Sequence, residues 1–133
     1  MGWLQKLFGS EPEIMPVRLD DANFHAEVMQ SELPVLIDFW STTCAPCRQL
    51  EPVILNLTKE FNGQVKVCEA NVEVTAKVCA RLGIRSTPTV LYLHKGVEVE
   101  RVTGFRGSAY HREIIQNELL TRAQPPTVAK AAK

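Results

Sequence analysis

The sequence has no net charge and no long apolar run. Its 15 lysine and arginine residues balance 15 aspartate and glutamate residues, so no long-range field draws it to nucleic acid or to an anionic membrane. Basic residues do not cluster with aromatic ones, as they do in many nucleic-acid sites. No stretch approaches the roughly 18 consecutive apolar residues of a transmembrane helix, and residues 1–13 lack the apolar segment and cleavage site of a secretory signal. We therefore expect a cytoplasmic protein with no transmembrane segment, which binds no nucleic acid and recognises its partners locally.

Cysteine and histidine are scarce, which limits the metal sites and disulfides that the chain can form. The three histidines, His25, His94 and His111, are isolated on predicted helix and strand positions, so we assign them to the surface or to packing. Cys68 and Cys79 lie in a predicted strand and a predicted helix, without the close second pair of a zinc ribbon, and we interpret them as small buried hydrophobic residues. Four cysteines in a reducing compartment also argue against a structural disulfide framework. We expect no metal site.

A chain of 133 residues is long enough for one domain with its own core. We expect an amphipathic leader over residues 1–15, a globular domain over residues 16–122 and a disordered tail over residues 123–133. The tail contains two prolines, small residues and lysines but no core-forming pattern. Four apolar residues of the leader would share one side of a short helix: Trp3, Leu4, Leu7 and Phe8. Such a helix could bind a partner or touch a membrane, but packing on its own domain or staying loose is favoured, because so short a helix is marginal alone.

Strand-like and helix-like segments alternate along the domain. Strands are predicted at residues 17–19, 35–40, 65–72, 89–94 and 97–103, and helices at residues 20–30, 44–62, 74–82 and between 108 and 122. The run from Val35 to Trp40 is almost continuously apolar, which is typical of a strand buried on both faces of a sheet. Lys95-Gly96 joins the last two strands as a β-hairpin. The pattern predicts an α/β fold.

Cys44 and Cys47 are separated by Ala45-Pro46 at the start of a predicted helix. A sulfur at a helix N-terminus faces unpaired N–H groups and the positive end of the helix dipole, both of which favour the thiolate. Cys44 is therefore the candidate nucleophile, and Cys47, one turn further on, is close enough to form a disulfide with it. Ala45 and Pro46 add no charge and no donor, which favours a reductant of disulfides over an oxidant. Half of a zinc site is the alternative for such a pair, but its complement is missing.

The motifs around this pair occur in a characteristic order. V-L-I-D-F-W leads into C-A-P-C, a proline follows five residues after Cys47, and then come I-R-S-T-P-T-V, K-G-V and G-F-R-G. In this order and spacing, residues 17–121 resemble the thioredoxin family. The resemblance implies an α/β thioredoxin fold, in which helices flank a central mixed β-sheet on both faces. It also implies a thiol–disulfide oxidoreductase that reduces protein disulfides.

The resemblance further implies catalytic roles for three residues. Cys44 would be the exposed attacking thiol and Cys47 the shielded resolving thiol. Asp38 would lie buried behind Cys47 and help to move its proton, a task for a carboxyl group whose pKa burial has raised. An aspartate satisfied by backbone N–H groups is the alternative. Glu69 falls where many family members carry a lysine, so if it lies near Asp38, repulsion between the two should raise the pKa of one carboxyl group.

Four residues match substrate-binding or supporting positions of the family. Thr87-Pro88 matches its cis-proline, which would leave the backbone of Thr87 free to pair with an extended substrate. Gly104 matches part of the docking groove, where a missing side chain permits close approach, and Trp40 matches a tryptophan packed beneath the site. Thr43 departs from the family, in which this position usually carries tryptophan, and this departure puts the range of partners in doubt.

The resemblance implies no cofactor beyond the redox-active Cys44–Cys47 disulfide. Electrons would come from an external reductase of the thioredoxin reductase type, the substrates would be disulfide-containing proteins, and the chain would be a monomer. The alternative function is a thioredoxin-like binding module that holds one dedicated partner and has weak general reductase activity. Turnover of a generic disulfide distinguishes the two functions.

Overall fold

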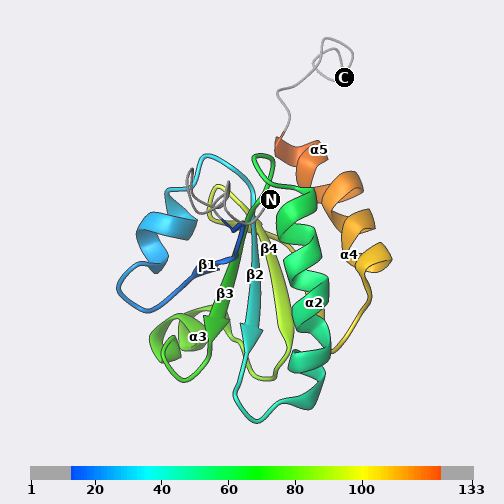
Figure 1. The fold of residues 1–133 in the computed structure, drawn as a ribbon. Helices are drawn as coiled ribbons and strands as arrows, with labels where there is room; N and C mark the ends of the chain where they lie inside the picture. Colours follow the sequence, from blue (N-terminus) through cyan, green and yellow to red (C-terminus); the bar gives the residue numbers. More distant parts are fainter. Residues whose placement is uncertain (1–12, 124–133) are drawn as a thin grey trace, which may run out of the picture.

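The apolar run that begins at Val35 forms strand β2 (Val35–Trp40), the middle strand of a five-stranded sheet. The computed structural model describes residues 13–123, so the predicted helix at Trp3–Phe8 and the predicted tail from residue 124 onward lie outside the described residues. The sheet has the order β1-β3-β2-β4-β5 (Figure 1). Its other strands are β1 (Val17–Arg18), β3 (Lys66–Asn71), β4 (Thr89–His94) and β5 (Val97–Thr103).

The sheet contains both parallel and antiparallel pairs. Strand β3 runs parallel to β1 on one side and to β2 on the other, whereas β4 runs antiparallel to β2 and β5 antiparallel to β4. The hairpin between β4 and β5 turns at Lys95 and Gly96, whose φ angles are 51° and 78°. Two consecutive positive φ angles are those of the type I′ turn, whose twist matches that of the flanking strands. The predicted mixed sheet and its hairpin are confirmed.

Side chains of β2 alternate between two apolar layers, one on each face of the sheet. Val35, Ile37 and Phe39 pack in the layer that includes residues of η1 (His25–Met29) and α3 (Ala76–Leu82). Leu36 packs in the other layer, with residues of α2 (Ala45–Glu60) and η2 (Ile115–Leu119). Helices therefore cover both faces, as predicted. Because Asp38 has the same parity as Leu36, its carboxyl group lies on the α2 face of the sheet.

Three consecutive helical segments end the described part of the chain on the α2 side of the sheet (Figure 1). They are α4 (Ser108–Ile114), η2 and α5 (Leu120–Ala123). The arginine of α4 at position 112 donates two hydrogen bonds to Glu60 at the end of α2, at 2.7 and 3.0 Å. This contact joins the last helical segments to the helix that carries the cysteine pair.

Two helices begin later than the apolar spacing predicted. Asp20 opens a turn instead of a helix: its side chain accepts a hydrogen bond from the N–H of Asn23 at 2.7 Å, and the Asn23 side chain accepts one from the N–H of Asp20 at 2.8 Å. The helix predicted from Val74 begins at Ala76. Val74 lies in a turn, where its N–H donates to the carbonyl of Asn71 at 3.0 Å, and the residue is 54% exposed. Val74 fits the spacing of the helical repeat in the sequence, although it lies in the turn before the helix.

Candidate active site

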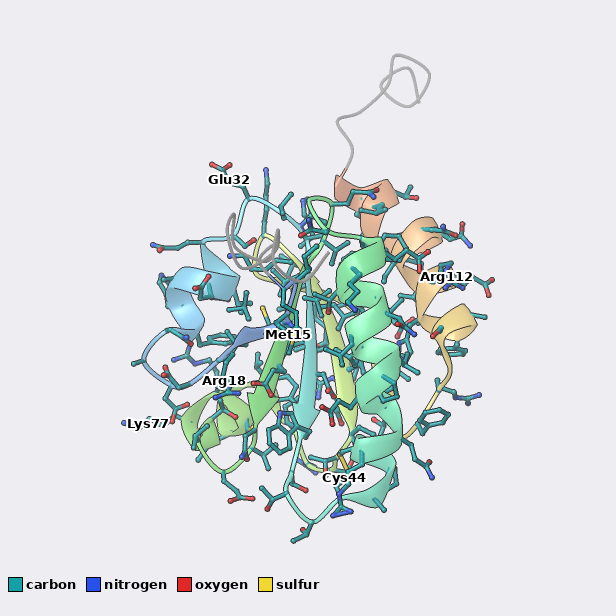
Figure 2. All side chains as sticks on the ribbon, in the orientation of Figure 1. Met15, Arg18, Glu32, Cys44, Lys77 and Arg112 are labelled. Carbon is teal, nitrogen blue, oxygen red and sulfur yellow. A yellow bond between two sulfur atoms is a disulfide. The ribbon has the colours of Figure 1, made fainter. Side chains whose placement is uncertain are left out.

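The cysteine pair lies at the start of α2, just after the loop that follows β2. Cys44 is the N-cap of this helix, and the figure with side chains shows it at the end of α2 that lies at the bottom of the view (Figure 2). Cys44 and Cys47 form a disulfide, with their Cα atoms 5.2 Å apart. The backbone N–H of Cys47 donates a hydrogen bond to the Cys44 sulfur at 3.2 Å. A helix N-terminus directed at this sulfur stabilises negative charge on it once the disulfide is reduced.

The two cysteines differ little in exposure in this oxidised form. Cys44 is 9% exposed and Cys47 is 5% exposed. The resemblance implied an exposed Cys44, and this expectation is wrong for the disulfide form, because each bonded sulfur covers part of the other. Cys44 is still the more accessible of the two.

Asp38 lies buried beside an acidic residue of the neighbouring strand. It is 5% exposed, and the parallel register pairs it with Glu69 of β3. Burial in the first place, and then the negative charges of Glu69 and Glu51, raise the pKa of Asp38 from its ordinary 3.8 to about 7. The predicted proximity of Asp38 and Glu69, and its effect on one carboxyl group, are confirmed. One oxygen of Asp38, Oδ1, has no hydrogen-bond partner among the described residues, so the alternative of an aspartate saturated by backbone N–H groups does not hold.

Two side chains hold Glu69 in place. Arg18 of β1 donates from Nε to Oε1 of Glu69 at 3.0 Å, and Trp40 donates from Nε1 to Oε2. Trp40 was predicted to support the site, and its contact in the structure is with this carboxylate. Arg18 was not singled out from the sequence. Its only signal there is its place in a short strand, which does not reveal that β3 lies next to it.

The segment before β4 supplies the predicted cis-proline. The peptide bond between Thr87 and Pro88 is cis. The hydroxyl group of Thr87 lies 3.2 Å from that of Ser41, in the loop that precedes Cys44. The N–H of Gly104 donates to the carbonyl of Pro88 at 2.9 Å. The structure thus joins three segments that are distant in the sequence: the loop before the cysteines, the cis-proline and the turn after β5.

Gly104 is a glycine for a backbone reason. Its φ angle is +89°, a value that residues with a side chain rarely adopt, and a Cβ atom there would meet nothing within 4 Å. The described residues therefore leave room for a side chain at position 104, and glycine is required there by the backbone conformation. The part of Gly104 in a docking groove stays a prediction.

A pocket of about 570 Å³ opens on the α2 face beside Asp38. Its polar lining consists of Arg18, Asp38, Trp40, Glu51 and Glu69. A smaller hollow of about 90 Å³ lies next to Cys47, and Trp40 and Glu51 line both spaces. Glu51 was missed in the sequence. Its signal was the spacing, since it lies four residues after Cys47 and therefore on the same face of α2.

The remaining cysteines and the histidines line neither of these two spaces. Cys68 and Cys79 are buried free thiols, as predicted, and burial raises the pKa of Cys68 to about 12. His111 is fully buried, and its Nδ1 pairs with the hydroxyl group of Tyr92. Among residues 13–123 no three His, Cys, Asp or Glu side chains are placed to hold a metal ion. Within the same part of the chain, no helix has the length and apolar character needed to cross a membrane.

Fold and site together define a thiol–disulfide oxidoreductase: a mixed sheet presents a cysteine pair at a helix N-terminus, with a buried carboxyl group behind it. The family model of thioredoxin matches residues 15–117. A thioredoxin of Rickettsia bellii is 35% identical over 105 residues, which are 79% of this chain and 100% of the relative. A thioredoxin of Synechocystis sp. is 39% identical over 87 residues, 65% of this chain and 81% of the relative.

A third relative is the chloroplastic thioredoxin M5 of Oryza sativa, which is 42% identical over 85 residues, 64% of this chain and 49% of the relative. The chain belongs to the thioredoxin family. It is a protein-disulfide reductase of the thioredoxin type, and the alternative of a mere binding module is not favoured.

Proposed function

We propose that Cys44 and Cys47 are the catalytic dithiol and act in two steps. In the first step the Cys44 thiolate attacks one sulfur of a substrate disulfide, a mixed disulfide forms, and the other substrate sulfur leaves as a thiolate that takes up a proton. In the second step Cys47 loses its proton and attacks Cys44, so the Cys44–Cys47 bond forms and the second substrate sulfur is released. Two electrons pass to the substrate. The observation that carries this proposal is the bonded pair at the N-terminus of α2, with 5.2 Å between the Cα atoms.

Asp38 is the proposed acceptor for the proton of Cys47. A general base works best when its pKa lies near the working pH, and burial with two neighbouring acids raises the pKa of Asp38 to about 7. The proposed route for the proton passes Glu51 and Trp40, which line both the hollow next to Cys47 and the pocket beside Asp38. Trp40 and Glu69 act as positioning residues through their hydrogen bond.

The proposed substrate is an extended segment of a disulfide-containing protein. The cis bond before Pro88 supports backbone pairing of Thr87 with such a segment. Gly104, which donates to the Pro88 carbonyl, would form the neighbouring wall of the groove. Thr43 is exposed and supplies no aromatic surface next to Cys44, so recognition rests on backbone contacts more than on aromatic packing.

The reductase needs no cofactor of its own in this proposal. The Cys44–Cys47 couple carries the electrons, and an external thioredoxin reductase-type enzyme returns the pair to the dithiol. A cytoplasmic location is proposed because a reducing compartment keeps the working dithiol reduced between turnovers. The chain is proposed to act as a monomer.

Single-cysteine variants test the assignment of the two sulfurs. Cys44→Ser is expected to abolish the reduction of insulin disulfides, because the attacking thiolate is lost. Cys47→Ser is expected to accumulate a covalent complex with the substrate, because nothing resolves the mixed disulfide. Mass spectrometry under non-reducing conditions detects that complex, and Cys68→Ser serves as the control for thiol loss at a buried site. An active Cys44→Ser protein would refute the proposal.

A further inference from the structure

The pocket beside Asp38 has the character of a binding site. Its volume of about 570 Å³ lies within the range of roughly 300–1,000 Å³ that ligand pockets occupy. Asp38 lines this space and is 95% buried, and its Oδ1 atom has no hydrogen-bond partner among the described residues. The walls also include an apolar part: Met15, Pro16, Ile54 and Leu55. The pocket therefore offers an apolar surface with an acidic floor.

The first described residues of the chain, just before β1, lie at the edge of this pocket. Met15 and Pro16 line it, and Figure 2 shows Met15 between β1 and α2. The residues just before β1 expose apolar surface, since Ile14 is 38% exposed and Met15 is 53% exposed. These two exposed apolar side chains next to a pocket are available for contact with an apolar segment.

The sequence that precedes these residues complements the pocket. Residues 3–8 read W-L-Q-K-L-F, with four large apolar side chains, one lysine and no acid. The charged lining of the pocket comprises three carboxyl groups against one guanidinium group: Asp38, Glu51, Glu69 and Arg18. A segment with an apolar side and one positive charge matches a pocket that is apolar and net acidic.

We propose that residues 3–8 dock in this pocket of their own chain, with Trp3, Leu4, Leu7 and Phe8 against its apolar wall and Lys6 toward its acidic lining. The tether favours this occupant over a separate partner. Residues 9–14 connect the segment to the rim, and six residues reach at most about 20 Å. So short a link gives an effective concentration in the millimolar range, which a free peptide does not match.

Nuclear magnetic resonance on the full-length oxidised protein tests the docking directly. We expect Overhauser contacts between the Trp3 indole and the methyl groups of Ile54 or Leu55. Leu4→Asp combined with Leu7→Asp should abolish these contacts, because it places two charges against the apolar wall. Gln5→Asp is the matched control: it adds a charge to the same segment on the opposite side of the helix predicted from the sequence, and it should leave the contacts intact.

Two further measurements locate the partner and identify the occupant. Leu55→Glu should abolish the contacts, whereas Val97→Glu, an equal change at a residue that is 65% exposed in β5, should not. Trp3 emission, taken as the difference between the wild type and Trp3→Phe, should lie at shorter wavelength than in the doubly charged variant. Absence of all contacts to Trp3, contacts that vanish on dilution as they would between two copies, or protection of Trp3 only when phospholipid vesicles are added would each overturn the proposal.

Discussion

At the scale of single residues, Asp38 shows how the fold obtains a proton acceptor near neutral pH. A carboxyl group that is 5% exposed ionises reluctantly, and Glu69, held next to it by Arg18 and Trp40, makes ionisation harder still. The two acids lie side by side because β2 and β3 pair in register. Burial is the largest cause of the raised pKa of Asp38, and the negative charge of Glu69 adds to it.

Glu69→Gln tests this pair. The substitution removes a negative charge but keeps an oxygen that can accept from the Trp40 indole. The pKa of Asp38 should fall, so the pH dependence of the resolving step should move to lower pH, by up to about one unit. Stopped-flow kinetics of insulin reduction between pH 5 and 9 measures this shift. Glu113→Gln, at an exposed site on α4, is the control, and an unchanged midpoint in Glu69→Gln would contradict the coupling.

At the scale of secondary-structure elements, two glycines at the ends of helices differ in what their backbones require. Gly83 ends α3 in the left-handed conformation, with φ +68°. Its backbone N–H donates a hydrogen bond to the carbonyl of Cys79 and so caps the helix. Gly107 precedes α4 with φ −79° and ψ 176°, a conformation open to any residue. A Cβ atom would meet nothing within 4 Å at either position. The two sites therefore differ in backbone strain and in the end of the helix that they cap.

Gly83→Ala and Gly107→Ala form a matched pair. We expect Gly83→Ala to lower the free energy of unfolding by about 1 kcal/mol, because alanine is strained at positive φ. Gly107→Ala should be close to neutral, because it restricts the unfolded chain without straining the folded one, while alanine is a poorer N-cap than glycine. Urea unfolding followed by circular dichroism measures both. Equal effects of the two substitutions would show that φ is not the cause.

At the scale of the whole molecule, two buried groups on the same face of the sheet tilt the pH dependence of stability in opposite directions. The pKa of Asp38 is raised to about 7 by burial and neighbouring acids, so the folded state binds more protons and the free energy of unfolding falls as pH rises from about 4 to 7. Burial lowers the pKa of His111 to about 4, so the free energy of unfolding falls as pH drops from about 6.5 to 4. Each effect amounts to roughly 3–4 kcal/mol at most.

Removing one of the two groups should reveal how the other changes the free energy of unfolding with pH. In Asp38→Asn the free energy of unfolding should rise with pH between about 4 and 6.5, because the lowered pKa of His111 then acts without the opposing effect of Asp38. In the double variant Tyr92→Phe, His111→Leu it should fall between about 4 and 7, because Asp38 is left. The double change avoids an unpaired hydroxyl group in the core. Urea unfolding of the oxidised proteins across pH 4–8 checks both, and the wild type should show the flattest profile of the three.

The sequence by itself determined what depends on neighbours along the chain. Apolar periodicity placed β2 and α2, the cysteine spacing put Cys44 one helical turn from Cys47, and Lys95-Gly96 marked the hairpin. These features follow from local backbone geometry, which residues within a few positions control. The order of motifs added the fold and the cis bond before Pro88 through their resemblance to the thioredoxin family.

Only the tertiary structure decided how distant segments share one space. It inserted β3 between β1 and β2, and this insertion brought Glu69 to Asp38 and to Arg18. It also placed Glu51 in the lining of both the pocket beside Asp38 and the hollow next to Cys47. It buried His111 in the core, where the histidine pairs with Tyr92. The physical reason is that burial and charge proximity, which set the pKa of a group, arise from residues far apart in the chain, and no local pattern encodes which of them become neighbours.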